Sequence, residues 1–212
     1  MRYIFATGNA GKVEQIEMIM RLYNIHIKVE PQKSIGFKEE VIEDGNTFEE
    51  NSNIKATALF NYCKSIGMKD FVVFADDSGL CVDALDGRPG IYSDRYASEH
   101  ATIDENLDKL LEELKDKKTK EERSAKFVSV FIGYLSDGTQ IVSRGECKGS
   151  IALQRGKPSN LTYNPVFIPE GFDKPMGDLS DEEFKKVKHH REMAFEGFLE
   201  QLKELEKNQV KE

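Results

Sequence analysis

The stretch that decides the fold is FVVFADDSGLCVDAL, residues 71–85, in which five apolar residues run directly into two carboxylates, a serine and a glycine. A strand buried on both faces is continuously apolar, so Phe71–Ala75 is predicted to be a buried strand of an α/β sheet. The polar residues Asp76–Gly79 are expected where that strand ends, and open α/β sheets bind ligands beyond their strand ends. Because Asp76 and Asp77 repel each other, a positive partner is expected beside them. Mg²⁺ is the simplest candidate, since it binds one or two carboxylates together with substrate phosphates.

A second motif lies near the N-terminus. Arg2–Ala6 is predicted to be a short strand, and the apolar residues from Val13 onward recur at helical spacing. A small-residue loop between a strand and a helix binds phosphate with backbone N–H groups and the helix N-terminus, and a lysine adds charge. The spacing does not match a Walker A loop, and a tight strand-to-helix turn without a ligand is the alternative. The residues of this loop are Thr7, Gly8, Asn9, Ala10, Gly11 and Lys12.

Basic residues at two further places suit an anionic ligand. Thr47–Glu50 has the pattern of a helix N-terminal capping box, and this helix is predicted to reach about as far as Ile66. Lys55 projects from the apolar stripe of the helix, toward either an anion or solvent. Lys185–Arg191 is the densest basic cluster of the chain, although a solvated helix face would explain that cluster by itself. Combined with the carboxylates and the N-terminal loop, these residues indicate a metal-assisted site for a phosphorylated ligand.

The remaining segments predict a mixed sheet. His26–Glu30 is a further strand candidate. Ala125–Leu135 and Gln140–Cys147 flank an Asp-Gly turn signal, which is typical of an antiparallel hairpin. Lys148–Leu153 is a separate strand candidate, and the polar, turn-rich segment Gln154–Asn164 is a candidate site loop.

The composition sets limits on what the protein does. A chain of 212 residues suits one large domain or two small lobes, and no change in composition locates a boundary. The formal net charge of −8 argues against nucleic acid and anionic membranes as partners. The three cysteines show no CxxC spacing, so neither a disulfide framework nor a zinc site is predicted. With no apolar run of ~20 residues and no signal-peptide pattern, a cytoplasmic protein is expected.

Taken in order, several motifs resemble the inosine triphosphate pyrophosphatase family, whose members hydrolyse noncanonical purine nucleoside triphosphates. The resemblance covers nearly the whole chain, and the motifs are quite specific when they are taken jointly. The residues that carry it are Thr7-Gly8-Asn9-Ala10-Gly11-Lys12, Thr47-Phe48-Glu49-Glu50-Asn51 with Lys55-Ala56, Ala75-Asp76-Asp77-Ser78-Gly79-Leu80, Pro89-Gly90-Ile91-Tyr92-Ser93 and His190-Arg191.

The resemblance implies a single pyrophosphatase domain over residues 1–212, with a long mixed β-sheet flanked by helices, two lobes with an active-site cleft between them, and a homodimer. It also implies Mg²⁺-dependent hydrolysis of dITP, ITP or XTP to the monophosphate and pyrophosphate. Asp77 is then the proton acceptor and a metal ligand, and Asp76 and Glu43 are further candidate metal ligands. The implied substrate contacts are the loop Thr7–Lys12, Lys55 and Ser78, the segment Leu161, Thr162, Tyr163 and Asn164, and, on the base side, Lys185, His190 and Arg191.

Three departures from the family pattern concern the metal and the base. The family's metal-binding Glu is Ile42 here, so Glu43, the next residue, is the candidate. The family's Phe-Gly-Tyr-Asp is Leu161–Asn164, which loses an aromatic stacking face and a carboxylate, and the Ser before His-Arg is His189. A pocket that pairs with a base rejects others because buried polar groups go unpaired, so changed partners change or relax the choice of base. Two alternatives therefore stay open: the same chemistry with relaxed base specificity, and a nucleotide-binding module with weak catalysis.

Overall fold

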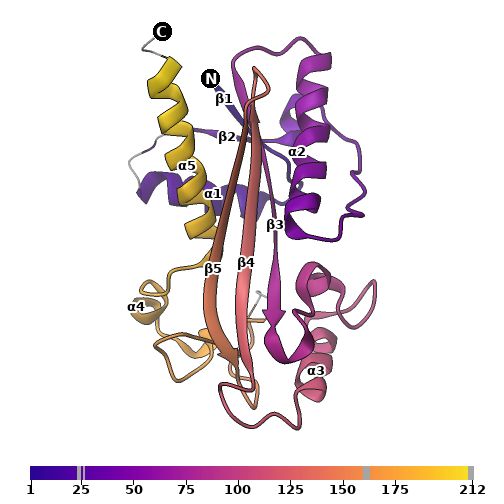
Figure 1. Cartoon of the computed structure of the whole chain (residues 1–212), viewed down its shortest axis with the longest axis vertical. Helices are drawn as coiled ribbons and strands as arrows, with labels where there is room; N and C mark the ends of the chain where they lie inside the picture. The colour runs from indigo at the N-terminus through magenta and orange to yellow at the C-terminus, as the bar shows by residue number, and fades with distance from the viewer. Residues whose placement is uncertain (23–24, 26, 160–162, 210–212) are drawn as a thin grey trace. The chain divides into compact units, whose positions relative to one another are not determined.

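The computed structural model describes residues 1–22, 25, 27–159 and 163–209. Its strands form a six-stranded sheet in the order β2-β1-β3-β4-β5-β6 (Figure 1). β1 pairs in parallel with β2 and β3, whereas β5 and β6 are antiparallel, so the predicted α/β fold with a mixed sheet is confirmed. The strands are β1 (Arg2–Phe5), β2 (Val29–Pro31), β3 (Phe71–Val82), β4 (Ser124–Leu135), β5 (Gln140–Ile151) and β6 (Phe167–Pro169). The helices are α1 (Ala10–Leu22), α2 (Phe48–Ser65), α3 (Ile103–Glu113), α4 (Asp181–Phe184) and α5 (His190–Gln209), with short 3₁₀ helices η1 (Gln32–Ile35), η2 (Asp83–Leu85), η3 (Gly90–Arg95) and η4 (Met176–Asp178).

Strand β3 is longer than predicted. It runs for 12 residues through Asp76 and Asp77, so the expectation that the strand ends before these carboxylates is wrong. The reason is the unequal length of its neighbours. β1 pairs with β3 only from Phe71 to Phe74 and then ends, whereas β4, on the other side of β3, is 12 residues long. The open sheet edge beside Asp76 therefore results from the end of β1, not from the end of β3.

Two further strand predictions also change. β5 is one unbroken strand of 12 residues, so the predicted separation into two strands after Cys147 is wrong. Its end, Gly149–Ile151, pairs with β6, and this pairing keeps the backbone extended. The strand predicted at His26–Glu30 is observed as β2 from Val29 onward, and His26 lies outside the described residues.

The chain divides into two compact units. Unit 1 comprises Met1–Asp77, Ser129–Gly145 and Arg191–Glu212, and unit 2 comprises Ser78–Val128 and Glu146–His190. Strands β3, β4 and β5 each have residues in both units. The borders of the units therefore fall inside strands, which explains why no change in composition marks a boundary.

Unit 1 has an aromatic core. The Phe5 and Phe74 rings stack with their centroids 4.9 Å apart, and Phe131, Phe195 and Phe198 pack around them. Helix α5 lies on one side of the strands and α2 on the other (Figure 1). Burial of these rings joins β1, β3, β4 and α5, so the chain that follows β1 and the carboxylates of β3 are held in fixed positions.

Unit 2 is organised around a buried arginine. The Arg123 side chain is 3% exposed, and its guanidinium donates hydrogen bonds to the backbone carbonyls of Leu114, Lys117, Ile151 and Ala152 at 2.6–3.1 Å. Burial lowers the pKa of this guanidinium. These bonds join the end of α3 to the end of β5 and satisfy carbonyls that would otherwise be buried without partners.

The cap predicted at Thr47 forms only in part. The Thr47 hydroxyl accepts from the Glu50 N–H at 3.0 Å, but the Glu50 carboxylate accepts from Asn46 rather than from Thr47, so only half of the predicted capping box forms. Ser180 and Glu183 form a complete capping box at the start of α4. In the part of the chain that the structure describes, no helix is long and apolar enough to cross a membrane.

Candidate active site

The predicted phosphate loop follows β1 and enters α1 at Ala10. The Asn9 side-chain oxygen accepts hydrogen bonds from the Gly11 N–H at 2.9 Å and the Lys12 N–H at 3.4 Å. The Asn9 N–H in turn donates to the Thr7 hydroxyl at 3.1 Å. Asn9 therefore caps the first turn of α1. The Asn9 side chain thus accepts hydrogen bonds from two of the N–H groups that were predicted to bind an anion. Side chains are therefore left to bind more of the anion.

Asp76 is a buried anion held between two cations. Only 2% of Asp76 is exposed, yet its Oδ1 lies 3.1 Å from Lys12 Nζ and its Oδ2 lies 3.0 Å from Arg191 Nε. Burial raises the pKa of Asp76, but the charges of Lys12 and Arg191 outweigh burial and hold the pKa well below its usual range. Arg191 also donates to Gln15 at 3.0 Å. Arg191, predicted on the base side, is therefore placed beside the phosphate loop.

Asp77 has a different environment, because successive side chains of a strand point to opposite faces. Its Oδ2 accepts a hydrogen bond from the Asn51 side chain at 3.2 Å. Burial raises the pKa of Asp77 to about 6, against the opposing effects of the Lys55 charge and the Asn51 hydrogen bond. The carboxylates of Glu43 and Asp76 raise it further. A carboxyl whose pKa lies near neutrality is suited to accept and release a proton.

Lys55 and Glu43 form an ion pair beside Asp77. Their charged atoms are 2.8 Å apart, and the Lys55 side chain is 15% exposed. The acidic segment that carries Glu43 is held against α2, because Gly45 donates its N–H to the Asn51 side chain at 2.9 Å. A Cβ atom at Gly45 would lie 2.7 Å from the Glu50 Cβ, so this close approach requires glycine.

A cavity of about 240 Å³ in unit 1 joins residues that the sequence places far apart. Thr7, Gly8 and Lys12 reach it from the N-terminal loop, Lys55 from α2 and Asp76 from β3. The structure thus brings together three motifs that were recognised separately in the sequence. Its further lining residues are Ala6, Gln32, Glu39, Glu40, Val41 and Glu43.

The predicted metal ligands fit Mg²⁺ in part. Among the described residues, no group of three or more His, Cys, Asp or Glu side chains is arranged to hold a metal ion. Both oxygens of Asp76 are bound by Lys12 and Arg191, and its role as a metal ligand stays a prediction. Asp77 and Glu43 are near enough for Glu43 to raise the pKa of Asp77. Two carboxylates suffice for Mg²⁺, which completes its coordination with substrate phosphates and water.

Of the residues predicted on the base side, Lys185 and His190 belong to unit 2, whereas Arg191 belongs to unit 1. Lys185 is exposed and follows α4, and the His190 ring stacks on Phe127 with the ring centroids 4.9 Å apart. The neighbouring residue His189 packs on Phe184, and its Nε2 is buried without a hydrogen-bond partner among the described residues. Contact with an aromatic ring, stacked for His190 and tilted for His189, therefore fixes the orientation of both histidine rings.

The segment predicted to line the base pocket is only partly described. Leu161 and Thr162 lie outside the described residues. Tyr163 and Asn164 are buried, at 2% and 7% exposure, and the Tyr163 hydroxyl donates to the Ser93 carbonyl at 2.8 Å. Tyr163 was predicted as a substrate contact, but its polar atom is bound within the protein.

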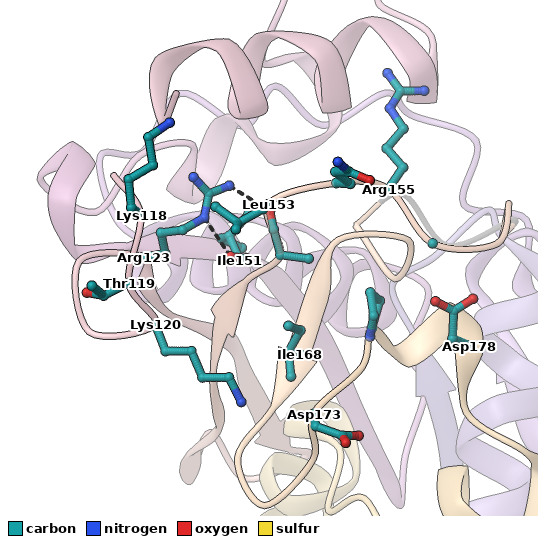
Figure 2. A pocket seen from close by; sticks show the side chains of 14 residues that line it. Lys118, Thr119, Lys120, Arg123, Ile151, Leu153, Arg155, Ile168, Asp173 and Asp178 are labelled. Carbon is teal, nitrogen blue, oxygen red and sulfur yellow. Dashed lines mark hydrogen bonds between the residues drawn. The ribbon is translucent and has the colours of Figure 1, made fainter. Parts of the chain in front are cut away.

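A larger cavity, of about 290 Å³, lies in unit 2. Gln154, Arg155 and Gly156 of the predicted site loop line it, but none of the residues predicted singly as a substrate, metal or catalytic contact does. Figure 2 shows Lys118, Lys120 and Arg123 on one side of it and Asp173 and Asp178 on the other. Its buried cation, Arg123, already donates to four backbone carbonyls. Cavity volume therefore does not identify the site here, whereas the grouping of Lys12, Lys55, Asp76 and Asp77 does.

Comparison with known proteins agrees with this geometry. A model of the Ham1 family matches residues 3–201. The chain belongs to the Ham1 family. A dITP/XTP pyrophosphatase of Clostridium perfringens (strain 13 / Type A) is 40% identical over 202 residues, which cover 95% of this chain and 97% of that protein. Another, from Bacillus subtilis (strain 168), is 38% identical over 187 residues, covering 88% of this chain and 89% of that protein.

Solved structures extend the similarity to the fold. The Ham1 protein of Staphylococcus aureus superposes with a TM-score of 0.81 at 33% identity, covering 97% of this chain and all, 100%, of that chain. The family resemblance that the motifs indicated is therefore confirmed, and the α/β architecture is that of Ham1 proteins.

Some residues near the site of this Ham1 protein had no predicted role. Asn51 binds Asp77, and Gln15 binds Arg191. A sequence signal for Gln15 exists, because it lies three residues after Lys12 and so on the same face of α1. Gln32, by contrast, follows β2, and only the parallel pairing of β1 with β2 brings it to the cavity.

Proposed function

We propose that this protein hydrolyses noncanonical purine nucleoside triphosphates, such as dITP, ITP and XTP, to the monophosphate and pyrophosphate in a Mg²⁺-dependent reaction. The observation that carries the proposal is the unit 1 cavity, in which Lys12 and Lys55 lie with a buried, ion-paired Asp76. The relatives named dITP/XTP pyrophosphatases, 38–40% identical over most of both chains, support the substrate class. Residues 1–212 act as a single domain, a reading supported by a family match over residues 3–201.

The triphosphate is held by the loop Thr7–Lys12 and by Lys55. Lysine ammonium groups bind phosphate oxygens as point charges, and their partial burial strengthens the attraction. Asp76 holds Lys12 and Arg191 in place through both carboxylate oxygens. Arg191 therefore belongs with the phosphate loop in this proposal, and Asp76 acts by orienting cations.

Asp77 accepts the proton of the attacking water. The water oxygen forms a bond to phosphorus, the anhydride bond between the first and second phosphates breaks, and pyrophosphate leaves with the electron pair of that bond. With a pKa of about 6, Asp77 is mostly ionised at neutral pH and close to the optimum for proton transfer. Asp77 and Glu43 would hold Mg²⁺, whose chemistry is to neutralise charge on the phosphate oxygens.

The base is recognised by Lys185, His190 and the residues Leu161, Thr162 and Asn164 around Tyr163, with Ser78 as a further substrate contact. The stacked His190 ring has a fixed orientation, which suits it to discriminate between bases. His189 adds a buried ring nitrogen without a partner among the described residues, so a base that offers a hydrogen bond there would be favoured.

The test is pyrophosphate release from a panel of dITP, ITP, XTP and the common triphosphates, with Mg²⁺ and with excess EDTA. We expect release that requires Mg²⁺ and is at least about tenfold faster with the noncanonical bases. Equal rates across the panel would favour relaxed base specificity. Tight nucleotide binding with no pyrophosphate would overturn the proposal in favour of a binding module.

We also propose a homodimer, which the family resemblance implies. Size-exclusion chromatography with light scattering is expected to give the mass of two chains at micromolar concentration. The mass of one chain would contradict it without affecting the proposed reaction.

A further inference from the structure

Tyr163 is bound to the protein at both ends of the residue. Its hydroxyl donates to the Ser93 carbonyl at 2.8 Å in a buried hydrogen bond. Its own carbonyl accepts the N–H groups of Val166 and Phe167, both at 3.0 Å. With 2% of the residue exposed, no polar atom of its side chain is left for a ligand. The bond to Ser93 spans 70 positions of the chain, so it joins two distant segments of unit 2.

Ser93 connects that bond to strand β3. Its hydroxyl accepts the Leu80 N–H at 2.9 Å and donates to the Gly90 carbonyl at 2.6 Å. Ser93 is itself 5% exposed, so these bonds are shielded from water. Leu80 lies two residues after Ser78, which is a proposed substrate contact. Ser93 therefore links the strand that carries Ser78 to the turn that begins at Tyr163.

The far side of this turn is held by its backbone. The Asn164 carbonyl accepts the Gly177 N–H at 2.9 Å, and the Pro165 carbonyl accepts the Gly156 N–H at 2.7 Å. A Cβ atom at Gly177 would lie 2.7 Å from the Lys157 carbonyl oxygen, so the segments meet without room for a side chain. The Tyr163 hydroxyl is thus the side-chain anchor of a turn whose other restraints are backbone bonds.

We infer that Tyr163 and Ser93 are positioning residues that set the place of Asn164 for base recognition, and that Tyr163 does not itself contact substrate. The inference rests on the proposed function, in which Asn164 contacts the base. A hydroxyl–carbonyl bond within a buried turn fixes where the neighbouring residue lies, so its loss weakens binding of the base more than it changes the chemical step.

The main test compares Tyr163→Phe with Tyr134→Phe. Tyr134 is a matched control, because its hydroxyl also makes side-chain hydrogen bonds, to Asn53 and Gln140, but these lie in unit 1 and outside the proposed site. For Tyr163→Phe we expect the KM for dITP to rise about fivefold, the factor for one hydrogen bond, with kcat within about twofold. Tyr134→Phe should leave both constants unchanged. An unchanged KM in Tyr163→Phe, or a fall in kcat at constant KM, would overturn the inference.

A second variant tests the link through Ser93. Ser93→Ala removes the hydroxyl that bonds Ser93 to Leu80 and Gly90, and it leaves the Tyr163 side chain unchanged. If both residues act through one link, the fold-increase in KM of the Tyr163→Phe/Ser93→Ala double variant should be well below the product of the fold-increases of the two single variants. Fully multiplicative effects would contradict a shared link.

Amide hydrogen exchange separates this inference from the proposed function. If the wild-type protein releases no pyrophosphate, the proposed function fails, but the effect of the Tyr163–Ser93 hydrogen bond on the turn can still be measured. The amides of residues 163, 164, 166 and 167 should exchange faster in Tyr163→Phe than in the wild type and in Tyr134→Phe. Unchanged exchange in that segment would overturn the positioning role whatever the activity.

Discussion

The charged cluster of unit 1 and the anchored turn of unit 2 hold their predicted functional residues in different ways. In unit 1, side-chain charges meet across long stretches of sequence, as in the pair of Asp76 and Arg191, which are 115 positions apart. In unit 2, Tyr163 and Asn164 are held by a buried hydroxyl and by backbone bonds. Residue type therefore indicates function well in the first region, because burying a charge is costly unless the charge is paired or binds a ligand. It indicates function less well in the second region, where the bonds are made by neutral groups.

The largest effect should come from Asp77. Asp77→Asn removes the proposed proton acceptor and a metal ligand but keeps the size of the side chain. Turnover of dITP, measured by pyrophosphate release, should fall by roughly 10²–10⁴-fold, the usual contribution of a general base. The matched control is Asp83→Asn, an exposed carboxyl on η2 at the end of the same strand, which should leave turnover unchanged. Activity of Asp77→Asn within tenfold of the wild type would remove Asp77 from the mechanism.

The next effect concerns stability and separates Asp76 from its neighbour. Asp76→Asn leaves the partly buried Lys12 and Arg191 without their shared anion, so the free energy of unfolding in urea should fall by about 3 kcal/mol. Glu49→Gln breaks the exposed ion pair of Glu49 with Arg144 and should change the free energy of unfolding by less than about 1 kcal/mol. If both variants lost the same small amount of stability, Asp76 would not be the electrostatic centre of unit 1.

The smallest effect is a pH dependence in unit 2. Burial lowers the pKa of His189, and a hydrogen bond to the Phe184 backbone opposes this only in part. As the pH falls through about 6.5, the unfolded chain takes up a proton on His189 that the folded protein does not. His189 therefore makes the free energy of unfolding decrease as the pH falls. His189→Gln should therefore make the decline in unfolding free energy between pH 7 and pH 5 shallower than in the wild type. A steeper decline in the variant would mean that the His189 pKa is raised on folding.

The fold could be predicted from the sequence where local patterns suffice. The apolar runs of β1 and β3, the helical spacing after Val13 and the Thr47 cap are all local signals. The ends of β3 and β5 could not be predicted, because each strand continues for as long as a neighbour pairs with it, and that neighbour is far away in the sequence.

For the candidate site, the sequence by itself determined the chemical groups: an N-terminal loop with a lysine, two adjacent carboxylates and a lysine on an apolar helix stripe. Only the tertiary structure decided what each group does. Asp76 and Asp77 are neighbours, but a strand turns successive side chains to opposite faces. One therefore meets Lys12 and Arg191, which lower its pKa, and the other is buried beside Asn51 with a raised pKa. No local pattern separates two identical residues in sequence, because their pKa values depend on which distant charges the fold brings to each face.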